Sequence, residues 1–577
     1  MCSPPKTSSP AKTSPVSSHG RTKSNGISFN TFVFSLIMAL AISSVYSVAL
    51  QLEKAFLPPD EKFLLEVPHL SSFTTGEALI FCASTMLILI CYIKWQMIQL
   101  QRINLNMPHV PSYIPFLGTA LQFLTNTPWD LMESWHRVYG PIYAFKLLGA
   151  TCVSIEKPEY LKDVLQSKIQ NVKKDSNFSY KPFLPILGTG IVTSEGKEWM
   201  YQRRKISTAL KIDVLELIPG ATLGAVKRLM KKMDQCAESG SSIDIEEELR
   251  HLTLQVISEC FLSLEAAESD TTFATMYLPI VEEGNKRVWS PERFYMFFMP
   301  FWWRHKFGVR RLNNYVSKLI VDRWNLRKSG NAKSGKKDIL DKVLDHYESE
   351  NPGKDLTSRW VRQLRDEFKT FMLAGHETSA AMMTWTFLEL IKKNELKQSV
   401  ESEATNVFGV HNWLDGKMDE SQLPNREELS NLTFSEGCLR EALRLYSVVP
   451  CVMRQTIAPT KVGNHIIPSG ANININIQSV HHNEEYWPKP MEYDPSRFTD
   501  PSVKPKPYTF LPFIDGPRNC LGQYLALLES KMVISLISQR YDFELVQKEL
   551  AGEEDPRHRY IVPVKPKGTL DVFVTKK

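Results

Sequence analysis

The sequence predicts a mainly α-helical protein with small β-sheets, and three features support this fold class. Residues 358–394 contain a single glycine, Gly375, and no proline, which favours one uninterrupted helix of roughly 50 Å at the helical rise. Residues 524–540 form a second run without glycine or proline. Two β-rich stretches are expected to form hairpins, residues 141–156 around Leu148 and Gly149, and residues 461–477 around a turn at 468–470.

Composition indicates a globular protein with a large core. The chain has 577 residues, of which 43% are hydrophobic and 23% charged. These shares are ordinary for a folded protein of this size. The formal net charge of +6 is small for the length and spread along the chain, so nucleic acid is not an expected partner.

Cysteine usage points to a reducing compartment around the folded part. The nine cysteines are odd in number, scattered, and never arranged as C-x-x-C. This pattern argues against a disulfide framework and against a zinc site.

The N-terminal hundred residues predict a membrane anchor. Residues 1–27 are rich in Ser, Pro, Thr and Lys without any acid, and are expected to form a disordered basic tail. Within the anchor, residues 28–98, an uncharged stretch at 31–50 is long enough to span a bilayer. A second span is expected at about 78–95, with Glu77 and Lys94 at the interfaces; the alternative there is a buried or interfacial helix.

The charges that flank these spans predict the orientation and the location. Basic residues are more frequent outside the two spans than between them, which favours a hairpin with both ends cytosolic. They are Lys6, Lys12, Arg21 and Lys23 before the first span, Lys54 and Lys62 between the spans, and Lys94 and Arg102 after the second. We expect an endoplasmic reticulum membrane with a cytosolic catalytic domain. A plastid membrane is the alternative, because the acid-free tail is also typical of a transit peptide.

A proline-rich hinge is expected between the anchor and the catalytic domain. Pro108, Pro111 and Pro115 lie close together in residues 99–117, and such spacing stiffens a linker against both helix and sheet. Residues 118–577 are then expected to form the catalytic domain.

A single cysteine stands on the loop 513–522, directly before the predicted helix 524–540. Gly516, Pro517 and Gly522 shape this loop, so Cys520 is offered at a helix N-terminus, where backbone N–H groups are expected to lower the pKa of its thiol. Such a thiolate suits a soft metal, and Arg518 could pair with carboxylates of the cofactor that carries it. The alternative is an inert buried thiol.

The spacing Phe513-x-x-Gly516-x-Arg518-x-Cys520-x-Gly522 resembles the haem-binding loop of the cytochrome P450 superfamily, the haem-thiolate monooxygenases, in their eukaryotic membrane-bound form. The resemblance implies the cytochrome P450 fold and haem b (iron protoporphyrin IX) as cofactor. It also implies that Cys520 is the iron ligand and that Phe513, Arg518 and Gly522 contact the haem.

Two further segments resemble the propionate-binding sites of this superfamily. Trp199 and Arg203 are four residues apart and so share a helical face; the resemblance implies that Arg203 binds a haem propionate beside Trp199. The alternative is a surface cation beside an aromatic ring. Arg454 is implied as a second propionate partner.

The segment 374–379 inside the long predicted helix resembles the oxygen-activation segment of the superfamily. The resemblance implies that Ala374 leaves room over the haem and that Glu377 and Thr378 act in catalysis. A carboxylate and a hydroxyl could relay protons during oxygen activation. The alternative is a solvated Glu377 and a Thr378 without a chemical role.

Glu441 and Arg444 are three residues apart on another apolar helix and match the Glu-x-x-Arg motif of the superfamily. There the pair joins a third residue, which implies Arg497 here. Since buried charges persist only when they are paired, we expect this trio to be a structural clamp behind the haem.

The motifs together predict a monooxygenase that inserts one atom of O2 into a lipophilic substrate, such as a fatty acid, a sterol, a carotenoid or another terpenoid. Electrons must come from a partner, because no G-x-G-x-x-G follows a strand and no flavin or iron–sulfur signature is present. We expect an NADPH-dependent reductase, or a ferredoxin if the protein is plastidial.

Two alternatives remain. A hydroperoxide isomerase or dehydratase needs no reductase, but enzymes of that kind typically lose the acid and threonine that Glu377 and Thr378 supply here. The other alternative is a membrane haem-binding protein without turnover.

Two surface features complete these expectations. The aromatic stretch 294–303 is either an access lip that touches the bilayer or the packed end of a helix. A reductase is expected to dock through cations near the haem-binding segments, namely Arg203, Arg204, Lys205 and Lys531.

Overall fold

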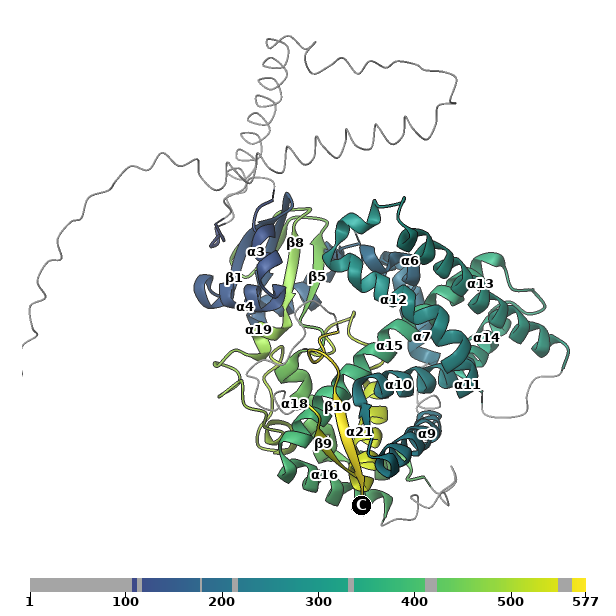
Figure 1. Cartoon of the computed structure of the whole chain (residues 1–577). Coiled ribbons are helices and arrows are strands. Elements are labelled where there is room, and N and C mark those ends of the chain that lie inside the picture. Colours follow the sequence, from purple (N-terminus) through teal and green to yellow (C-terminus); the bar gives the residue numbers. More distant parts are fainter. Residues whose placement is uncertain are drawn as a thin grey trace, which may run out of the picture. The chain divides into compact units, whose positions relative to one another are not determined.

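The computed structural model describes residues 106–111, 117–176, 179–209, 216–330, 337–409, 423–547 and 563–577 (Figure 1). The predicted tail, both predicted membrane spans and most of the hinge lie outside these residues. Among the described helices, none is both long and apolar enough to cross a bilayer.

The long helix predicted from the sequence is present as α15 (Ser358–Lys392). It begins where the Thr357 side chain accepts a hydrogen bond from the Trp360 backbone N–H at 3.2 Å, and it ends where Lys393 leaves the helical conformation. The helices that pack against it include α10 (Ile245–Leu262), α13 (Pro300–Lys328), α18 (Thr433–Tyr446) and α21 (Gln523–Arg540). The helix predicted over 524–540 is α21, so both helix predictions are confirmed within two residues.

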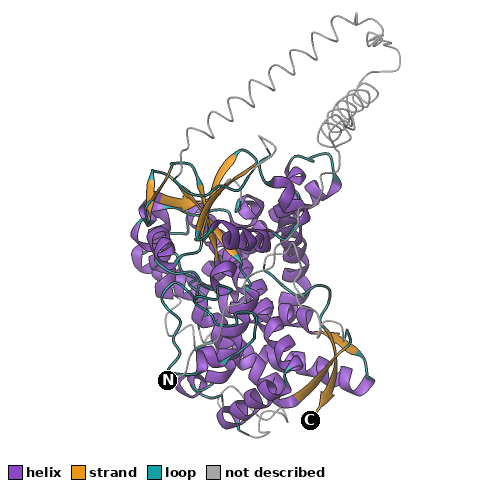
Figure 2. Cartoon of the chain, turned by 90° about the vertical axis from the view of Figure 1, so that its left-hand side faces the viewer, coloured by secondary structure: helices purple, strands orange, loops and turns teal. Residues whose placement is uncertain are grey.

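The remaining helices are short or surround this centre (Figures 1 and 2). The α-helices are α3 (Ala120–Thr125), α4 (Pro128–Tyr139), α5 (Pro158–Lys162), α6 (Leu184–Leu187), α7 (Gly196–Ala209), α9 (Ile218–Ser239), α11 (Ala266–Glu268), α12 (Ala274–Trp289), α14 (Ile339–Glu350), α16 (Asn394–Phe408), α17 (Arg426–Ser430), α19 (Ile477–His481) and α20 (Ser496–Thr499). Short 3₁₀ and π turns are η1 (Asp163–Ser167), η2 (Ile169–Asn171), η3 (Lys181–Phe183), η4 (Ser269–Phe273) and η5 (Pro291–Phe294).

The strands form small sheets that lie in separate groups (Figure 2). The largest sheet has the order β1 (Ile142–Leu147), β2 (Ala150–Ile155), β8 (Asn472–Asn476), β5 (Cys451–Thr456), β3 (Val172–Lys174), with β2 and β8 parallel and the other pairs antiparallel. A second has the order β4 (Ser242–Asp244), β10 (Asp571–Lys576), β9 (Tyr541–Leu545). The third pairs β6 (Thr460–Val462) with β7 (His465–Ile467). The prediction of a mainly helical fold with small sheets is therefore confirmed.

One predicted hairpin is confirmed and the other is wrong. Leu148 and Gly149 join β1 to β2 with φ angles of 48° and 80°, the two positive values that a tight hairpin turn needs. The second hairpin, β6 and β7, turns instead at Gly463, where φ is 55°. Residues 468–470 lead from β7 to β8, which belongs to the large sheet because it pairs with β2 and β5.

Four aromatic side chains of the stretch 294–303 are exposed, while its other aromatic side chains are half-buried. The side chains of Tyr295, Phe297 and Phe298 are 69%, 64% and 69% exposed, and Trp303 is 43% exposed at the start of α13. Packing of a helix end in the core, one of the two alternatives from the sequence, is therefore excluded for these side chains.

Candidate active site

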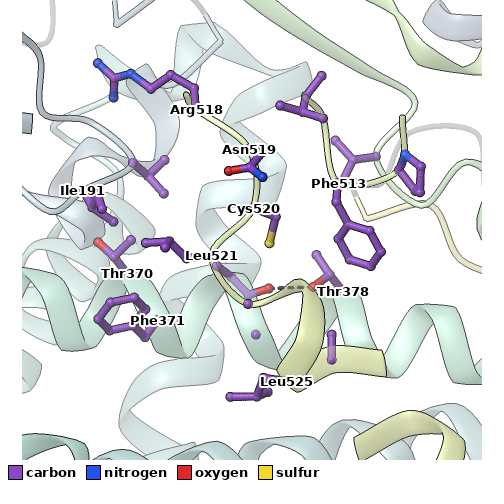
Figure 3. A pocket seen from close by; sticks show the side chains of 18 of the residues that line it. Ile191, Thr370, Phe371, Thr378, Phe513, Arg518, Asn519, Cys520, Leu521 and Leu525 are labelled. Atoms are coloured by element: carbon purple, nitrogen blue, oxygen red, sulfur yellow. Dashed lines mark hydrogen bonds between the residues drawn. The ribbon is translucent and has the colours of Figure 1, made fainter. Parts of the chain in front are cut away.

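A cavity of about 350 Å³ lies between α15, the start of α21 and the loop that precedes α21 (Figure 3). Nine of the residues singled out in the sequence line it, although they come from four separate segments. They are Trp199, Arg203, Ala374, Thr378, Arg454, Phe513, Arg518, Cys520 and Gly522. The fold thus brings these motifs to one place.

The loop 513–522 is a tight structure that presents Cys520 to the cavity. The backbone N–H of Cys520 donates to the Phe513 carbonyl oxygen at 2.9 Å, and the N–H of Asn519 donates to the Gly516 carbonyl oxygen at 3.0 Å. Gly516 has a φ of 77°, and a Cβ there would lie 2.2 Å from the Leu165 carbonyl oxygen, so only glycine fits. Figure 3 shows the sulfur pointing into the cavity, with Phe513 and Arg518 on opposite sides.

The protein environment of the thiol differs from the expectation of a lowered pKa. The sulfur is accessible from the cavity, but protein surrounds the cavity, and this burial raises the pKa of Cys520. The backbone N–H groups of Gly522 and Gln523 and the charge of Arg203 lower it by less. Desolvation therefore outweighs the helix N-terminus, whereas a metal cation bound to the sulfur would favour the thiolate.

Four cations share one edge of the cavity: Lys174, Arg203, Arg454 and Arg518. Arg518 donates to the Ser194 carbonyl oxygen at 3.0 Å and to the carboxylate of Glu195, and its guanidinium lies 3.8 Å from the centre of the Trp199 ring. Burial, with smaller contributions from Arg454 and Arg203, lowers the pKa of Arg518 from 12.5 to about 10 against the opposing effect of Glu195. These four cations thus place positive charge at one edge of the cavity, where water screens it only weakly because the side chains are buried or half-buried.

Arg203 and Arg454 differ in how their guanidinium groups are bonded. Arg203 donates to the backbone oxygen of Asn519 at 2.6 Å and to the side chain of the same residue, so it braces the cysteine loop. Arg454 donates to the Met453 carbonyl oxygen at 2.9 Å, while its buried Nε has no hydrogen-bond partner among the described residues. A buried guanidinium with an unbonded N–H favours an anionic ligand.

Lys174 and Tyr180 belong to the same edge, and neither was identified from the sequence. Burial lowers the pKa of Lys174. Burial raises the pKa of Tyr180, but Lys174 and Arg454 together outweigh it and leave that pKa below its ordinary value. No local pattern marks these two residues, because their role depends on the neighbours that folding brings to them.

This edge and the thiol fit a haem. Haem carries two carboxylates, which need buried cations, and an iron, which needs an axial ligand. Lys174, Arg203, Arg454 and Arg518 would hold the carboxylates and Cys520 the iron. The unpaired Nε of Arg454 is the observation that favours this fit.

Helix α15 contributes Thr378 to the cavity but directs Glu377 elsewhere. The Thr378 hydroxyl donates to the Ala374 carbonyl oxygen at 2.6 Å within the helix (Figure 3). Glu377 is not among the described residues that line the cavity; it accepts a hydrogen bond at 2.9 Å from Arg250 on α10. Burial raises the pKa of Glu377, but His376 and Arg250 lower it by more, so the carboxyl is ionised at neutral pH.

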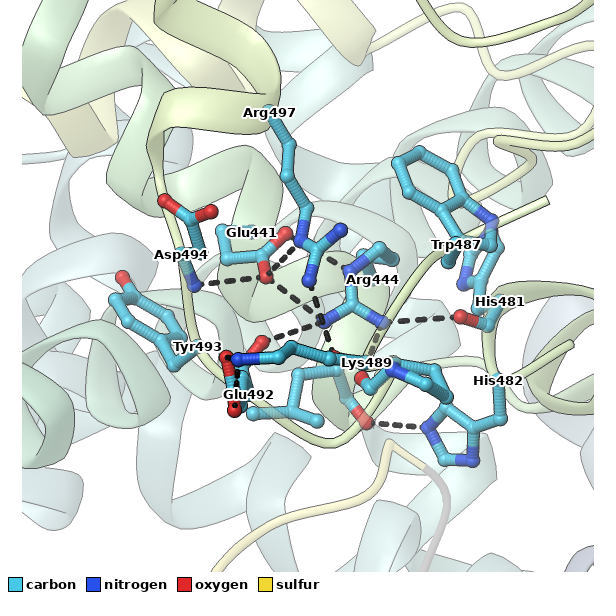
Figure 4. A network of polar contacts seen from close by, with 12 residues as sticks. Glu441, Arg444, His481, His482, Trp487, Lys489, Glu492, Tyr493, Asp494 and Arg497 are labelled. Carbon is cyan, nitrogen blue, oxygen red and sulfur yellow. Dashed lines mark hydrogen bonds and ion pairs between the residues drawn. The ribbon is translucent and has the colours of Figure 1, made fainter. Parts of the chain in front are cut away.

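Glu441, Arg444 and Arg497 meet behind the cavity wall (Figure 4). Arg444 donates twice to the Glu441 carboxylate, at 2.8 and 2.7 Å, and Arg497 Nε lies 3.3 Å from the same carboxylate. The remaining N–H groups of Arg444 donate to three carbonyl oxygens, those of His481, Pro490 and Glu492. The cluster ties α18 to the segment 481–497.

The predicted docking cations are only partly available at the surface. Arg204 is exposed, whereas Arg203 is bonded to the cysteine loop and Lys205 is paired with Glu350 at 2.5 Å. Lys531 is 7% exposed and lies 3.3 Å from Glu436, so the expectation that it is an exposed cation is wrong. It lies on α21, whose buried side chains surround it.

Comparison with known proteins agrees with this geometry. A model of the family Cytochrome P450 matches residues 108–570. Among similar proteins, Cytochrome P450 4c21 of Blattella germanica is 29% identical over 489 residues, which cover 81% of this chain and 93% of the relative. Cytochrome P450 4F8 of Homo sapiens is 27% identical over 439 residues, 73% of this chain and 80% of the relative. Cytokinin hydroxylase of Arabidopsis thaliana is 27% identical over 443 residues, 75% and 80%.

The match to the family model covers most of the chain and includes every residue that lines the cavity. The chain therefore belongs to the cytochrome P450 family, a family of monooxygenases.

Proposed function

We propose that this protein inserts one atom of O2 into a lipophilic small molecule, with haem b as cofactor and Cys520 as the iron ligand. One observation carries the proposal: the thiol of Cys520 opens into a cavity whose edge holds four buried or half-buried cations, one of them, Arg454, with an unpaired Nε. When bound, the haem supplies the oxidising chemistry, since an axial thiolate favours cleavage of the O–O bond.

The side chains of the protein then have distinct tasks. Lys174, Arg203, Arg454 and Arg518 bind the haem carboxylates, Trp199 stacks on Arg518, and Phe513 and Gly522 shape the space around the sulfur. Thr378 holds a proton at the cavity wall through its hydroxyl. To resupply that proton, the Glu377 carboxylate leaves Arg250, takes up a proton from water and passes it to Thr378.

The lining of the cavity away from the cations is apolar, which supports a lipophilic substrate. Ile191, Val192, Phe261, Phe371 and Met382 contribute to it. A fatty acid, a sterol, a carotenoid or another terpenoid has the apolar surface that such a wall would bury.

The exposed aromatic side chains Tyr295, Phe297, Phe298 and Trp303 support a membrane location, because aromatic rings concentrate at bilayer interfaces. We propose the endoplasmic reticulum membrane with an NADPH-dependent reductase as electron donor. A plastid membrane with a ferredoxin is the alternative that the basic, acid-free N-terminus favours.

The iron ligand is tested by the variant Cys520→Ser. The reduced carbon monoxide complex of the wild type should show the red-shifted Soret band of a thiolate-bound haem, and the variant should lose it. Cys236→Ser, at a half-buried cysteine on α9, is the matched control and should keep the band. If the band persists in Cys520→Ser, the assignment is wrong.

The reaction class is tested by Thr378→Ala. Haem content should stay unchanged, while electrons from the reductase should emerge as hydrogen peroxide in place of oxygenated product, because proton delivery is impaired. Product formation from a hydroperoxide without any electron donor, insensitive to this change, would instead support an isomerase or dehydratase.

A further inference from the structure

The loop 188–194 lies between α6 and α7 and forms one wall of the cavity through Ile191 and Val192. It is pressed onto α15. A Cβ on Gly188 would lie 2.1 Å from a carboxylate oxygen of Asp366, and a Cβ on Gly190 would lie 2.1 Å from the Thr370 hydroxyl. Glycines at these positions therefore allow the backbone of the loop to reach the helix.

Acidic side chains of α15 accept hydrogen bonds from backbone N–H groups of this loop. The Ile191 N–H donates to the Glu367 carboxyl at 2.8 Å, and the Thr189 N–H donates to the Asp366 carboxylate at 3.1 Å. Gln363 connects the two sides, since its amide donates to the Thr189 carbonyl oxygen at 3.1 Å and to Glu367 at 2.8 Å. The cavity wall is thus held by a carboxyl that is 5% exposed.

We propose that Glu367 is a positioning residue that fixes the loop 188–194, and with it Ile191 and Val192, against α15 and so controls access to the cavity. The assignment of this cavity to the substrate rests on the proposed function; the contact between Glu367 and the loop does not.

Asp366 and Glu367, the two acidic residues that bind the loop, differ in whether a cation lies beside the carboxyl group. Asp366 is paired with Lys369 at 3.0 Å and with Arg365 at 2.9 Å. Glu367 receives only hydrogen bonds from Ile191 and Gln363, and the charged groups that act on it are Asp366 on its own helix and Glu198 on α7. Burial, and to a smaller extent these two acids, raise the pKa of Glu367 from 4.5 to about 7.

The direction of the pH effect follows from this shift. Water reaches the carboxyl when the loop opens, which returns its pKa toward 4.5, so the proton favours the closed loop and ionisation favours the open one. Between these two values the opening equilibrium should rise by about tenfold per pH unit, and above the higher value it should level off.

The test is hydrogen exchange of the loop amides in the full-length, haem-loaded protein, measured on peptides that contain Ile191 and corrected for the intrinsic pH dependence of exchange. In the wild type, protection should fall by about fivefold from pH 6 to 7, where the slope already declines toward the higher pKa, and stay nearly level from 7.5 to 8.5. Peptides from the middle of α15 should show no such change.

Variants separate positioning from mere packing. Glu367→Gln keeps the shape and an oxygen acceptor but cannot ionise, so its loop should remain protected at pH 8 as well as at pH 6. Glu367→Asp should keep the pH dependence with lower protection, because the shorter side chain reaches the loop less well. Glu198→Gln is the matched control: it removes a nearby exposed acid and should preserve the fall between pH 6 and 7.

Access is measured on the same samples with 1-phenylimidazole as the probe. Its association rate should rise with pH in the wild type and not in Glu367→Gln. An equal fall in protection in Glu367→Gln, or no fall in the wild type, would overturn the proposal. A missing Soret response of the wild type would instead contradict the haem assignment, while the exchange data would still report on the loop.

Discussion

Two buried clusters of charge in this protein are built from similar residues and differ in how completely they are bonded. In the clamp behind the cavity, Arg444 makes five hydrogen bonds, two to Glu441 and three to carbonyl oxygens (Figure 4). At the cavity edge, Arg454 donates to the Met453 carbonyl oxygen and interacts with the Tyr180 side chain, and its buried Nε has no hydrogen-bond partner within the described chain.

This difference in hydrogen bonding helps to distinguish a buried cation with a structural role from one that binds a ligand. A guanidinium has five N–H groups, and its burial is tolerated when all five donate hydrogen bonds. Arg444 meets this condition with partners from the protein alone. Arg454 is incomplete, and three further cations lie along the same edge. Among the described residues, unbonded N–H groups also occur on buried or half-buried arginines elsewhere, Arg497 of the clamp among them. An open N–H that lies beside three further cations along a cavity is what favours a site for anions, here the carboxylates of haem.

The largest effect should come from breaking the clamp. Arg444→Ala leaves Glu441 buried without its partner, and we expect a loss of about 3–5 kcal/mol in the free energy of unfolding. Chemical denaturation measures it. Arg444→Lys should recover a part, because one charge returns without the planar geometry. A loss below about 1 kcal/mol would show that the clamp is not structural.

A substitution at the cavity edge should lower the affinity for haem and have little effect on the stability of the fold. Arg454→Ala removes a buried guanidinium whose Nε is unbonded, so the unfolding free energy of the haem-free protein should change by much less than in Arg444→Ala. Haem affinity should fall by about tenfold or more, since a hydrogen bond to a charged group contributes about 1.5–3 kcal/mol.

Transfer of haem to an apo-globin scavenger measures this affinity. Arg204→Ala, at an exposed cation on α7, is the matched control and should leave the transfer rate unchanged. Equal loss of stability and haem affinity in Arg454→Ala would contradict the distinction between the two clusters.

The smallest effect concerns a third cluster, where the charge of one member depends on pH. Hydrogen bonds to Asp270 and Glu247 raise the pKa of His251 from 6.5 to about 9, against the opposing effect of burial. Since the folded pKa is the higher one, the stabilisation is fully present below pH 6.5 and is lost as the pH rises toward 9.

His251→Gln should therefore lower the unfolding free energy by about 1–2 kcal/mol at pH 6, and this difference should shrink by pH 9. Denaturation curves of both proteins at several pH values measure it. A difference that does not change with pH would show that His251 acts through packing alone.

Much of the site could be predicted because its signals are local in the chain. Residues 513–522 carry their glycine, arginine and cysteine at fixed spacing, and the run without proline at 358–394 sets α15 almost to its ends. Properties that depend on a residue's surroundings were predicted wrongly: Lys531 is buried beside Glu436, and burial raises the pKa of Cys520. The predicted turn of the second hairpin was wrong because β8 pairs with β5 in the large sheet and not with β7, and strand pairing depends on the sheet that folding brings near.

The sequence by itself determined the two helices α15 and α21, the spacing of the cysteine loop and the residue types available to a haem, because backbone propensity and motif spacing act between neighbours in the chain. Only the tertiary structure decided which buried charged side chains have partners for their hydrogen-bonding groups and which do not. Arg203 meets Asn519, Arg250 meets Glu377, and Glu367 meets the loop at Ile191, across separations of 316, 127 and 176 residues. The physical reason is that pKa values and the cost of an unpaired charge depend on desolvation and through-space partners, and these exist only once the chain has folded.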